Sequence, residues 1–246
     1  MRAAAARTPP ASKGSMRSPV AVIVLALSAA AWSQPQPVTW LIFIDDLHLQ
    51  FVETGRLRSV LHTIGREGAR RDGDSCVVRC SGPSCSTGKD APLTCALLAD
   101  WRGATGNGLK AEDQLRDRAD GKPRELIYRA ELALNAADAL LRDAPAGGRS
   151  VLLYISDGYL TAAGASERLS GFAAAAAAKD VRAFPVPFRR VEYDPGRTPS
   201  ISPEQWQVLL NETAGSLAIL ANQTGGRVIP NPLDGGLASI LPLVGK

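Results

Sequence analysis

The sequence predicts an α/β fold, a doubly wound and mostly parallel sheet with helices on both faces. Residues 38–44 and 150–155 are apolar runs, rich in β-branched and aromatic residues, and acids follow each run directly. Such runs are typical of strands buried on both faces. Segments with the apolar spacing of surface helices alternate with these runs, and this alternation is typical of parallel sheets.

The first half of the chain contains one of these buried strands and a shorter strand beside it. In order, we expect a strand at 38–44, a surface helix at 51–67, a strand at 75–80, an exposed loop at 81–90 and a short edge strand running into a helical turn at 93–101. Residues 102–122 are polar and Gly-rich, which predicts a long loop. Within it, GATGNG at 103–108 follows no buried strand and lacks the Lys of a phosphate loop, so we interpret it as a flexible turn.

The second half continues the alternation of strands and helices. We expect helices at 124–142, 166–179, 203–223 and 233–243, and strands at 150–155, 181–188 and 227–230. Ser166 is the predicted N-cap of its helix, because a Ser oxygen accepts bonds from first-turn N–H groups. Pro185 and Pro187 lack backbone donors, so the strand at 181–188 should lie at an edge or end early.

Length and charge favour one large neutral domain over residues 38–243. The chain has 246 residues and 45% hydrophobic content, enough for a substantial core. The formal charge is +4, but four cations and no acid precede Asp45. The remainder has 24 cations against 24 anions, so we expect no nucleic-acid partner.

The first 33 residues have the pattern of a signal peptide, followed by a short linker at 34–37. An apolar segment at 19–32 follows Arg17 and leads into small residues, with cleavage fitting after Ala31 or Ser33. Met16 begins an equally good signal and is an alternative start. The segment is shorter than the roughly 20 residues of a membrane span. We therefore expect an exported protein, periplasmic or secreted, with no stable membrane span after cleavage.

All four cysteines lie within one short window, at Cys76, Cys80, Cys85 and Cys95. An oxidising compartment favours disulfides there, and the sequence does not choose among the three possible pairings. Free buried thiols and a zinc site are the alternatives. The zinc alternative lacks both a CxxC pair and a nearby His.

Three motifs, in this order, give the chain a family resemblance. FIDDLH at 43–48, SVLLYISDG at 150–158 and LAILANQTGGRVI at 217–229 resemble the von Willebrand factor type A domain. More narrowly, they resemble the exported bacterial proteins called von Willebrand factor type A related, and the resemblance covers residues 38–243. It implies the α/β fold predicted above and a protein-binding role.

The resemblance also implies a divalent metal site, of which this sequence keeps only part. The family binds metal through an Asp-x-Ser-x-Ser loop after the first strand, a Thr in a middle loop and an Asp after the fourth strand. Asp45 and Asp157 match this pattern. Leu47 and Leu49 replace both serines, and we expect them to fill the space of an ion and its waters. The middle loop, near 124–128, contains no Thr. We therefore predict a degenerate site, with no cofactor or weakly bound Mg²⁺.

The acids also have structural interpretations. Asp45 and Asp157 fit as caps of helix N-termini, where carboxylates are favoured by about 0.3–1 kcal/mol. Strand alternation would point Asp46 away from Asp45, which excludes it as a co-ligand. His48 fits either a third ligand or a packed loop residue.

We expect a non-enzymatic, exported module that binds an unidentified protein partner. No G-x-S-x-G nucleophile motif occurs, which argues against an α/β-hydrolase. The alternative is a metal-dependent hydrolase using Asp45, Asp46, Asp157 and His48. A scaffold that only packs against neighbours is a third interpretation.

Overall fold

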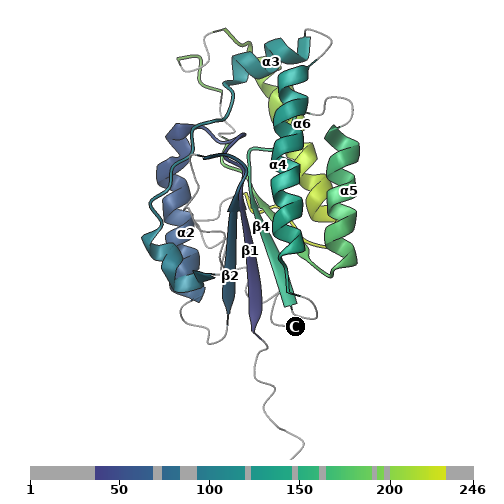
Figure 1. Ribbon diagram of the computed structural model, residues 1–246. Coiled ribbons are helices and arrows are strands. Elements are labelled where there is room, and N and C mark those ends of the chain that lie inside the picture. Colours follow the sequence, from purple (N-terminus) through teal and green to yellow (C-terminus); the bar gives the residue numbers. More distant parts are fainter. Residues whose placement is uncertain are drawn as a thin grey trace, which may run out of the picture. The chain divides into compact units, whose positions relative to one another are not determined.

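The structure is a computed structural model that describes residues 37–68, 74–83, 93–119, 123–145, 149–160, 165–189, 193–196 and 200–230. A central sheet with helices on both faces dominates this part of the chain (Figure 1). The predicted leader at 1–33 and the predicted terminal helix at 233–243 lie outside the described residues.

Five strands of the described chain form one sheet in the order β3-β2-β1-β4-β5. The strands are β1 (Val38–Ile44), β2 (Ser75–Cys80), β3 (Leu93–Thr94), β4 (Arg149–Ile155) and β5 (Arg182–Val186). β1 runs parallel to β2 and β4, β4 runs parallel to β5, and only the two-residue β3 is antiparallel. The predicted fold class is confirmed, and the winding direction of the sheet reverses between β1 and β4.

β1 is buried on both of its faces, as the unbroken apolar run predicts. Trp40 and Ile42 belong to the core on one side of the sheet, and Leu41 and Phe43 to the core on the other. Each such side chain contributes about 1.5–3 kcal/mol when it is fully buried. A strand without a polar face is stable only where both faces are covered, so β1 takes the centre of the sheet.

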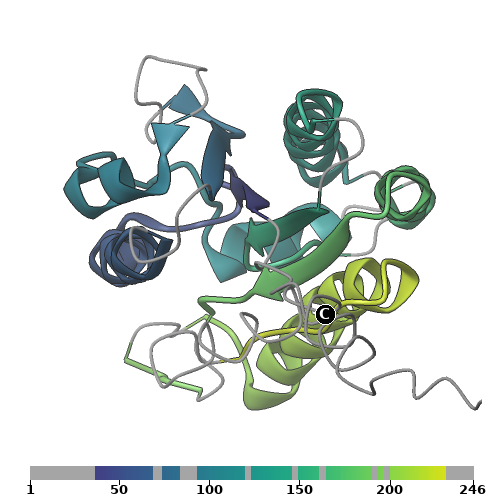
Figure 2. The same ribbon diagram turned by 90° about the horizontal axis from the view of Figure 1, so that it is seen from below.

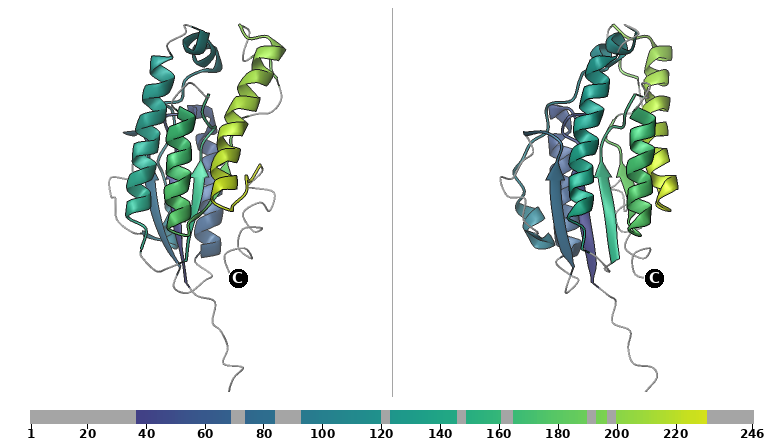
Figure 3. Two further views of the ribbon diagram at one scale, coloured as in Figure 1. Left: turned by 90° about the vertical axis from the view of Figure 1, so that its right-hand side faces the viewer. Right: turned by 45° about the vertical axis from the view of Figure 1, so that its right-hand side comes forward.

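Helices cover the two faces unequally (Figure 2). The helices α2 (Thr54–Gly68) and η3 (Cys95–Asp100) pack on one face. On the other face, α4 (Arg124–Arg142), α5 (Ala165–Ala178) and α6 (Pro203–Gln223) lie side by side (Figure 3). α2 faces the sheet through Leu57, Val60, Leu61 and Ile64, the spacing that marks one side of a helix.

A disulfide joins β2 to η3. Cys76 and Cys95 are bonded and both are buried, and no cysteine among the described residues is free. This confirms a disulfide in the cysteine window and selects the partner of Cys76, which spacing alone left open.

The prediction of a loop throughout 102–122 is wrong for its second half, where α3 (Ala111–Ala119) forms. The helix has acids in its first turn and arginines in its last turn, which complements the helix dipole. Its buried residues are Ala111 and Gln114. Because so few apolar residues face the core, hydrophobic spacing gives little indication of this helix.

Two smaller predictions also fail. Ser166 lies inside α5, which begins one residue earlier at Ala165, so it is not the N-cap. Residues 227–230 form no strand, although the Ile229 N–H donates a backbone hydrogen bond to the Pro185 oxygen at 2.8 Å. α6, by contrast, begins at Pro203 as predicted and is capped by Ser202, whose side chain accepts a bond from the Gln205 N–H.

Within the described part of the chain, no helix is both long enough and apolar enough to span a membrane.

Candidate functional site at the carboxyl edge of the sheet

The four parallel strands end at one edge of the sheet, and polar residues follow each of them. Asp45 follows β1, Ser81 follows β2, Ser156 and Asp157 follow β4, and Arg189 lies shortly after β5. In Figure 1 the arrowheads of β1 and β2 point towards the end of the molecule that carries α3. Ligands of open α/β sheets bind outside the carboxyl ends of the strands where the winding reverses, which here is between β1 and β4.

Asp45 is fully buried, and protein donors occupy both of its oxygens. Ser81 Oγ donates to Oδ1 at 2.9 Å and Ser156 Oγ donates to Oδ2 at 2.7 Å. His48 Nδ1 lies 2.9 Å from each oxygen. A carboxylate only accepts hydrogen bonds, so Nδ1 carries a proton. Asp45 thus connects the ends of β1, β2 and β4.

Two tyrosines close the inner side of this network. The Tyr159 ring meets the His48 ring edge to face at 4.6 Å between centroids, and its hydroxyl is hydrogen-bonded to that of Tyr154. Burial, followed by the negative charge of Asp45, raises the pKa of both phenols well above the usual value. Both phenols therefore remain neutral, and the surroundings of Asp45 are enclosed.

Asp46 belongs to a set of contacts separate from that of Asp45. Its Oδ1 accepts from the Gly106 N–H at 3.0 Å and its Oδ2 from Asn107 Nδ2 at 2.6 Å. The adjacent Thr105 is buried, and its N–H donates a hydrogen bond to Thr54 Oγ1 at 3.1 Å. The segment 103–108 is therefore an ordered loop held by Asp46 and not the flexible turn that its composition suggested.

The prediction that Leu47 and Leu49 fill the space of an ion differs from the structure, in which both side chains pack against the core. Leu49 is fully buried in the core on the α2 side of the sheet, and Leu47 packs against the core on the other side. The loop after β1 therefore uses its leucines to fix the backbone, while the Asp45 carboxylate lies among hydroxyl and imidazole donors.

Asp157 faces a guanidinium group. Its Oδ1 accepts from the Phe188 N–H at 3.0 Å, and its Oδ2 lies 3.8 Å from Arg189 Nε. The interpretation of Asp45 and Asp157 as helix caps is thus wrong among the described residues, since their donors come from loops and side chains. Burial raises the pKa of Asp157, while Arg189 and the backbone N–H groups act in the opposite direction.

Glu53 adds a second carboxyl group beside Asp157. It lies in η1 (Phe51–Glu53) and its Oε2 accepts from the Gln50 N–H at 2.7 Å. Burial, together with the charge of Asp157, raises the pKa of Glu53 to about 8. At neutral pH this neighbouring pair of carboxyl groups therefore retains a proton.

These residues do not fit a hydrated divalent ion. Mg²⁺ requires nearly octahedral oxygen coordination and usually keeps several waters. The hydroxyls of Ser81 and Ser156 donate to Asp45, and both Asp45 and Ser156 are fully buried. Arg189 already provides positive charge beside Asp157. No three His, Cys, Asp or Glu residues of the described chain gather as a metal-binding group.

A cavity of about 710 Å³ opens beside Asp157, and we call it the edge pocket. Its lining comprises Gln50, Val52, Glu53, Arg56, Lys110, Ala111, Glu112, Asp113, Arg116, Asp157, Phe188, Arg189, Ser200 and Trp206. Its volume is within the range of ligand pockets, roughly 300–1,000 Å³. Val52 belongs to this lining and is 63% exposed, and its neighbour Phe51, 72% exposed, lies near Gly106.

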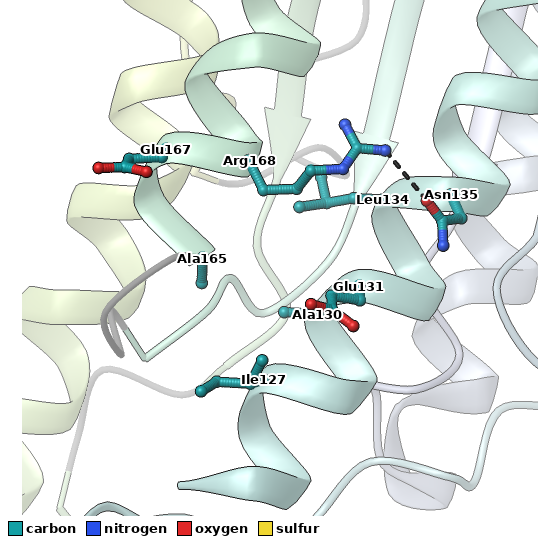
Figure 4. A pocket seen from close by; sticks show the side chains of 8 residues that line it. All are labelled: Ile127, Ala130, Glu131, Leu134, Asn135, Ala165, Glu167 and Arg168. Carbon is teal, nitrogen blue, oxygen red and sulfur yellow. Dashed lines mark hydrogen bonds between the residues drawn. The ribbon is translucent and has the colours of Figure 1, made fainter. Parts of the chain in front are cut away.

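A second cavity, of about 580 Å³, lies between α4 and α5 (Figure 4). Its cation, Arg168, forms an ion pair with Asp138 and donates to Asn135 Oδ1 at 3.1 Å. The remaining lining includes Ile127, Leu134 and Glu167. Because Asp138 already neutralises the charge of Arg168, we expect this cavity to bind a charged ligand less well than the edge pocket.

Sequence comparison gives no family for this chain, and structural comparison gives a distant likeness. No known sequence family and no curated protein matches the chain. Among solved structures, the N-terminal domain of TFIIH p34 is similar, with 14% identity and a TM-score of 0.44 over 85% of this chain and 98% of that chain. The fold class of the present chain rests on its own strand order and register.

Proposed function

We propose that this chain is an exported, non-enzymatic module that binds a protein partner at the carboxyl edge of its sheet, without a metal ion. One observation carries the proposal. Asp45, to which the resemblance assigns metal, is enclosed by Ser81, Ser156 and His48. The edge pocket beside Asp157 is open, and it adjoins η1, which carries the exposed Phe51 and Val52. Such a surface can recognise a partner but has no hydrated ion site.

Export is supported by the leader and by the buried disulfide. The segment 1–33 has the signal pattern, and the Cys76–Cys95 bond is typical of oxidising compartments. The test is a fusion of residues 1–33 to alkaline phosphatase, which needs its own disulfides for activity. Phosphatase activity in the exported fraction would support the proposal, and inactive cytosolic enzyme would contradict it.

The alternative, a metal-dependent hydrolase, needs Asp45, Asp46, Asp157 and His48 to act together. The contacts divide them, because Asp46 binds the 103–108 loop while Asp45 binds His48. The hydroxyls of Ser81 and Ser156 donate to Asp45 and not to the imidazole, so His48 activates neither of them as a nucleophile. Turnover of phosphoesters or esters that requires Mg²⁺ or Mn²⁺ would restore the enzymatic interpretation.

The binding proposal is tested by affinity capture from the exported fraction, with the immobilised chain as bait. A variant carrying Phe51→Ser and Val52→Ser should lose the captured partner, while EDTA should leave capture unchanged. Leu97→Ser is the matched control, because Leu97 is 53% exposed on η3, which packs against α2 near Gly65 and away from η1. Capture that survives the double substitution, or that EDTA abolishes, would contradict the proposal.

A further inference from the structure

The edge pocket contains a buried cation whose hydrogen-bonding capacity is largely unused. The side chain of Arg189 is 10% exposed, and its Nη1 is buried with no hydrogen-bond partner among the described residues. Nη2 donates to Gln114 Oε1 at 3.4 Å, and Nε lies 3.8 Å from Asp157 Oδ2. Charge-assisted N–H···O bonds normally measure about 2.7–2.9 Å. Both contacts are therefore long, and the guanidinium can accommodate a further acceptor.

We propose that Arg189 anchors a carboxylate of the partner, an acidic side chain that enters the edge pocket. A guanidinium presents its donors in a planar fork that matches the two oxygens of a carboxylate. An unsatisfied buried donor is unfavourable, and a carboxylate at Nη1 and Nη2 would remove that penalty. The inference rests on the proposed function, because it names the group through which the partner enters the pocket.

The charge of the lining supports an anionic group. The charged side chains that line the pocket are Arg56, Lys110, Arg116, Arg189, Glu53, Glu112, Asp113 and Asp157. Arg116 forms an ion pair with Asp113, and burial raises the pKa of Glu53 to about 8, so Glu53 is neutral at pH 7. Four cations thus face three anions at neutral pH. The pocket has a positive excess that would attract an acidic side chain.

The surroundings of the pocket also specify what should lie beside that carboxylate. The Phe188 ring packs under the Arg56 guanidinium at 4.9 Å, and Trp206 is part of the lining. Val52 continues this lining to the outside of the pocket, and its neighbour Phe51 is also exposed. An acidic residue next to a large apolar residue in the partner would satisfy both parts of the surface.

Fluorescence anisotropy of labelled hexapeptide pools with the full chain tests this inference. One pool fixes Asp or Glu beside Leu or Phe, and the matched pool carries Asn or Gln instead of the acid. We expect the acidic pool to bind about tenfold more tightly or better. Arg189→Gln should abolish this preference. Arg189→Lys should reduce it severalfold, because an ammonium keeps the charge but loses the fork.

Arg116→Gln is the matched control. It removes the same charge from the lining, but Arg116 is 71% exposed and already paired with Asp113, so affinity should change by less than about twofold. Thermal unfolding of each variant shows whether a loss of binding follows from a loss of folding. Arg189→Lys, which keeps the buried charge, should unfold close to the wild type.

Several outcomes would overturn the inference. One is equal binding of the acidic and amide pools. Another is tighter binding of a phosphoserine pool or of a Lys-containing pool. A third is a loss of affinity in Arg116→Gln as large as that in Arg189→Gln. If affinity capture still depends on Phe51 and Val52 while the acidic preference is missing, the proposed function stands and the carboxylate anchor fails. If the acidic preference holds but no partner is captured, the proposed function fails.

Discussion

At the scale of single residues, Asp45 acts as a structural carboxylate that joins three strand ends. Asp45→Asn would replace one acceptor oxygen by an NH₂ group facing a hydroxyl or imidazole donor. We expect a loss of about 2–4 kcal/mol in the free energy of unfolding. Urea denaturation measures it, with Asp143→Asn in the exposed pair with Arg79 as a control that should lose less than about 1 kcal/mol. Equal effects of the two substitutions would contradict this role.

Glu53 makes stability depend on pH in a predictable direction. Burial raises its folded-state pKa from 4.5 to about 8, so its stabilising contribution is complete below the unfolded pKa and is lost as pH rises through 8. Glu53→Gln imitates the protonated form and keeps an acceptor for the Gln50 N–H. Relative to the wild type, the variant should gain stability from about pH 5 to about pH 8 and level off above that pH. The free energy of unfolding of both proteins is measured by urea denaturation at each pH. If the difference between them does not change with pH, the raised pKa of Glu53 is disproved.

The sequence identified only some of the residues at the edge. Asp45 and Asp157 were predictable, because each acid ends a buried apolar run. Ser81 and Ser156 also follow strands, but a lone Ser at a strand end carries no distinguishing pattern. Arg189 and Glu53 matter to the site because they are buried. Their burial is not predictable from a Pro-containing loop or from an amphipathic helix. Sequence therefore predicted the acids at this edge of the sheet and missed the arginine beside them.

At the scale of elements, the Cys76–Cys95 disulfide holds η3 against β2. The two residues are 19 positions apart, and a loop of this length corresponds to about 3 kcal/mol of stabilisation. The double substitution Cys76→Ala, Cys95→Ala should therefore shift the urea midpoint downward by the equivalent of about that energy. An unchanged midpoint would mean that packing of Leu98 and Trp101 alone fixes η3.

The predictability of each element followed its burial. β1, β4 and α4 were predicted within one residue of their observed bounds, because long apolar patterns are the strongest local signal. The edge position of β5 followed from Pro185. α3 escaped prediction, because its helical stability comes from charge placement and from contacts with α4 and α6 that are distant in sequence.

At the scale of the whole sheet, strand order creates the site. The alternation of strands and helices predicted a parallel sheet, but local sequence does not specify which strands become neighbours. The observed order places β4 beside both β1 and β5, so the loops after β4 and β5 bring Asp157 and Arg189 together. A guanidinium from the loop after β5 thus lies beside the acid for which the resemblance implied a metal ion.

The most direct test of metal-free recognition at this edge is isothermal titration of Mg²⁺, Mn²⁺ and Ca²⁺ into chelator-treated protein. Wild type should give no saturable heat and no change in melting temperature, since Arg189 provides the positive charge beside Asp157. Arg189→Ser, which removes that charge, serves as the comparison. Stoichiometric binding to the wild type that Asp157→Asn abolishes would contradict the account.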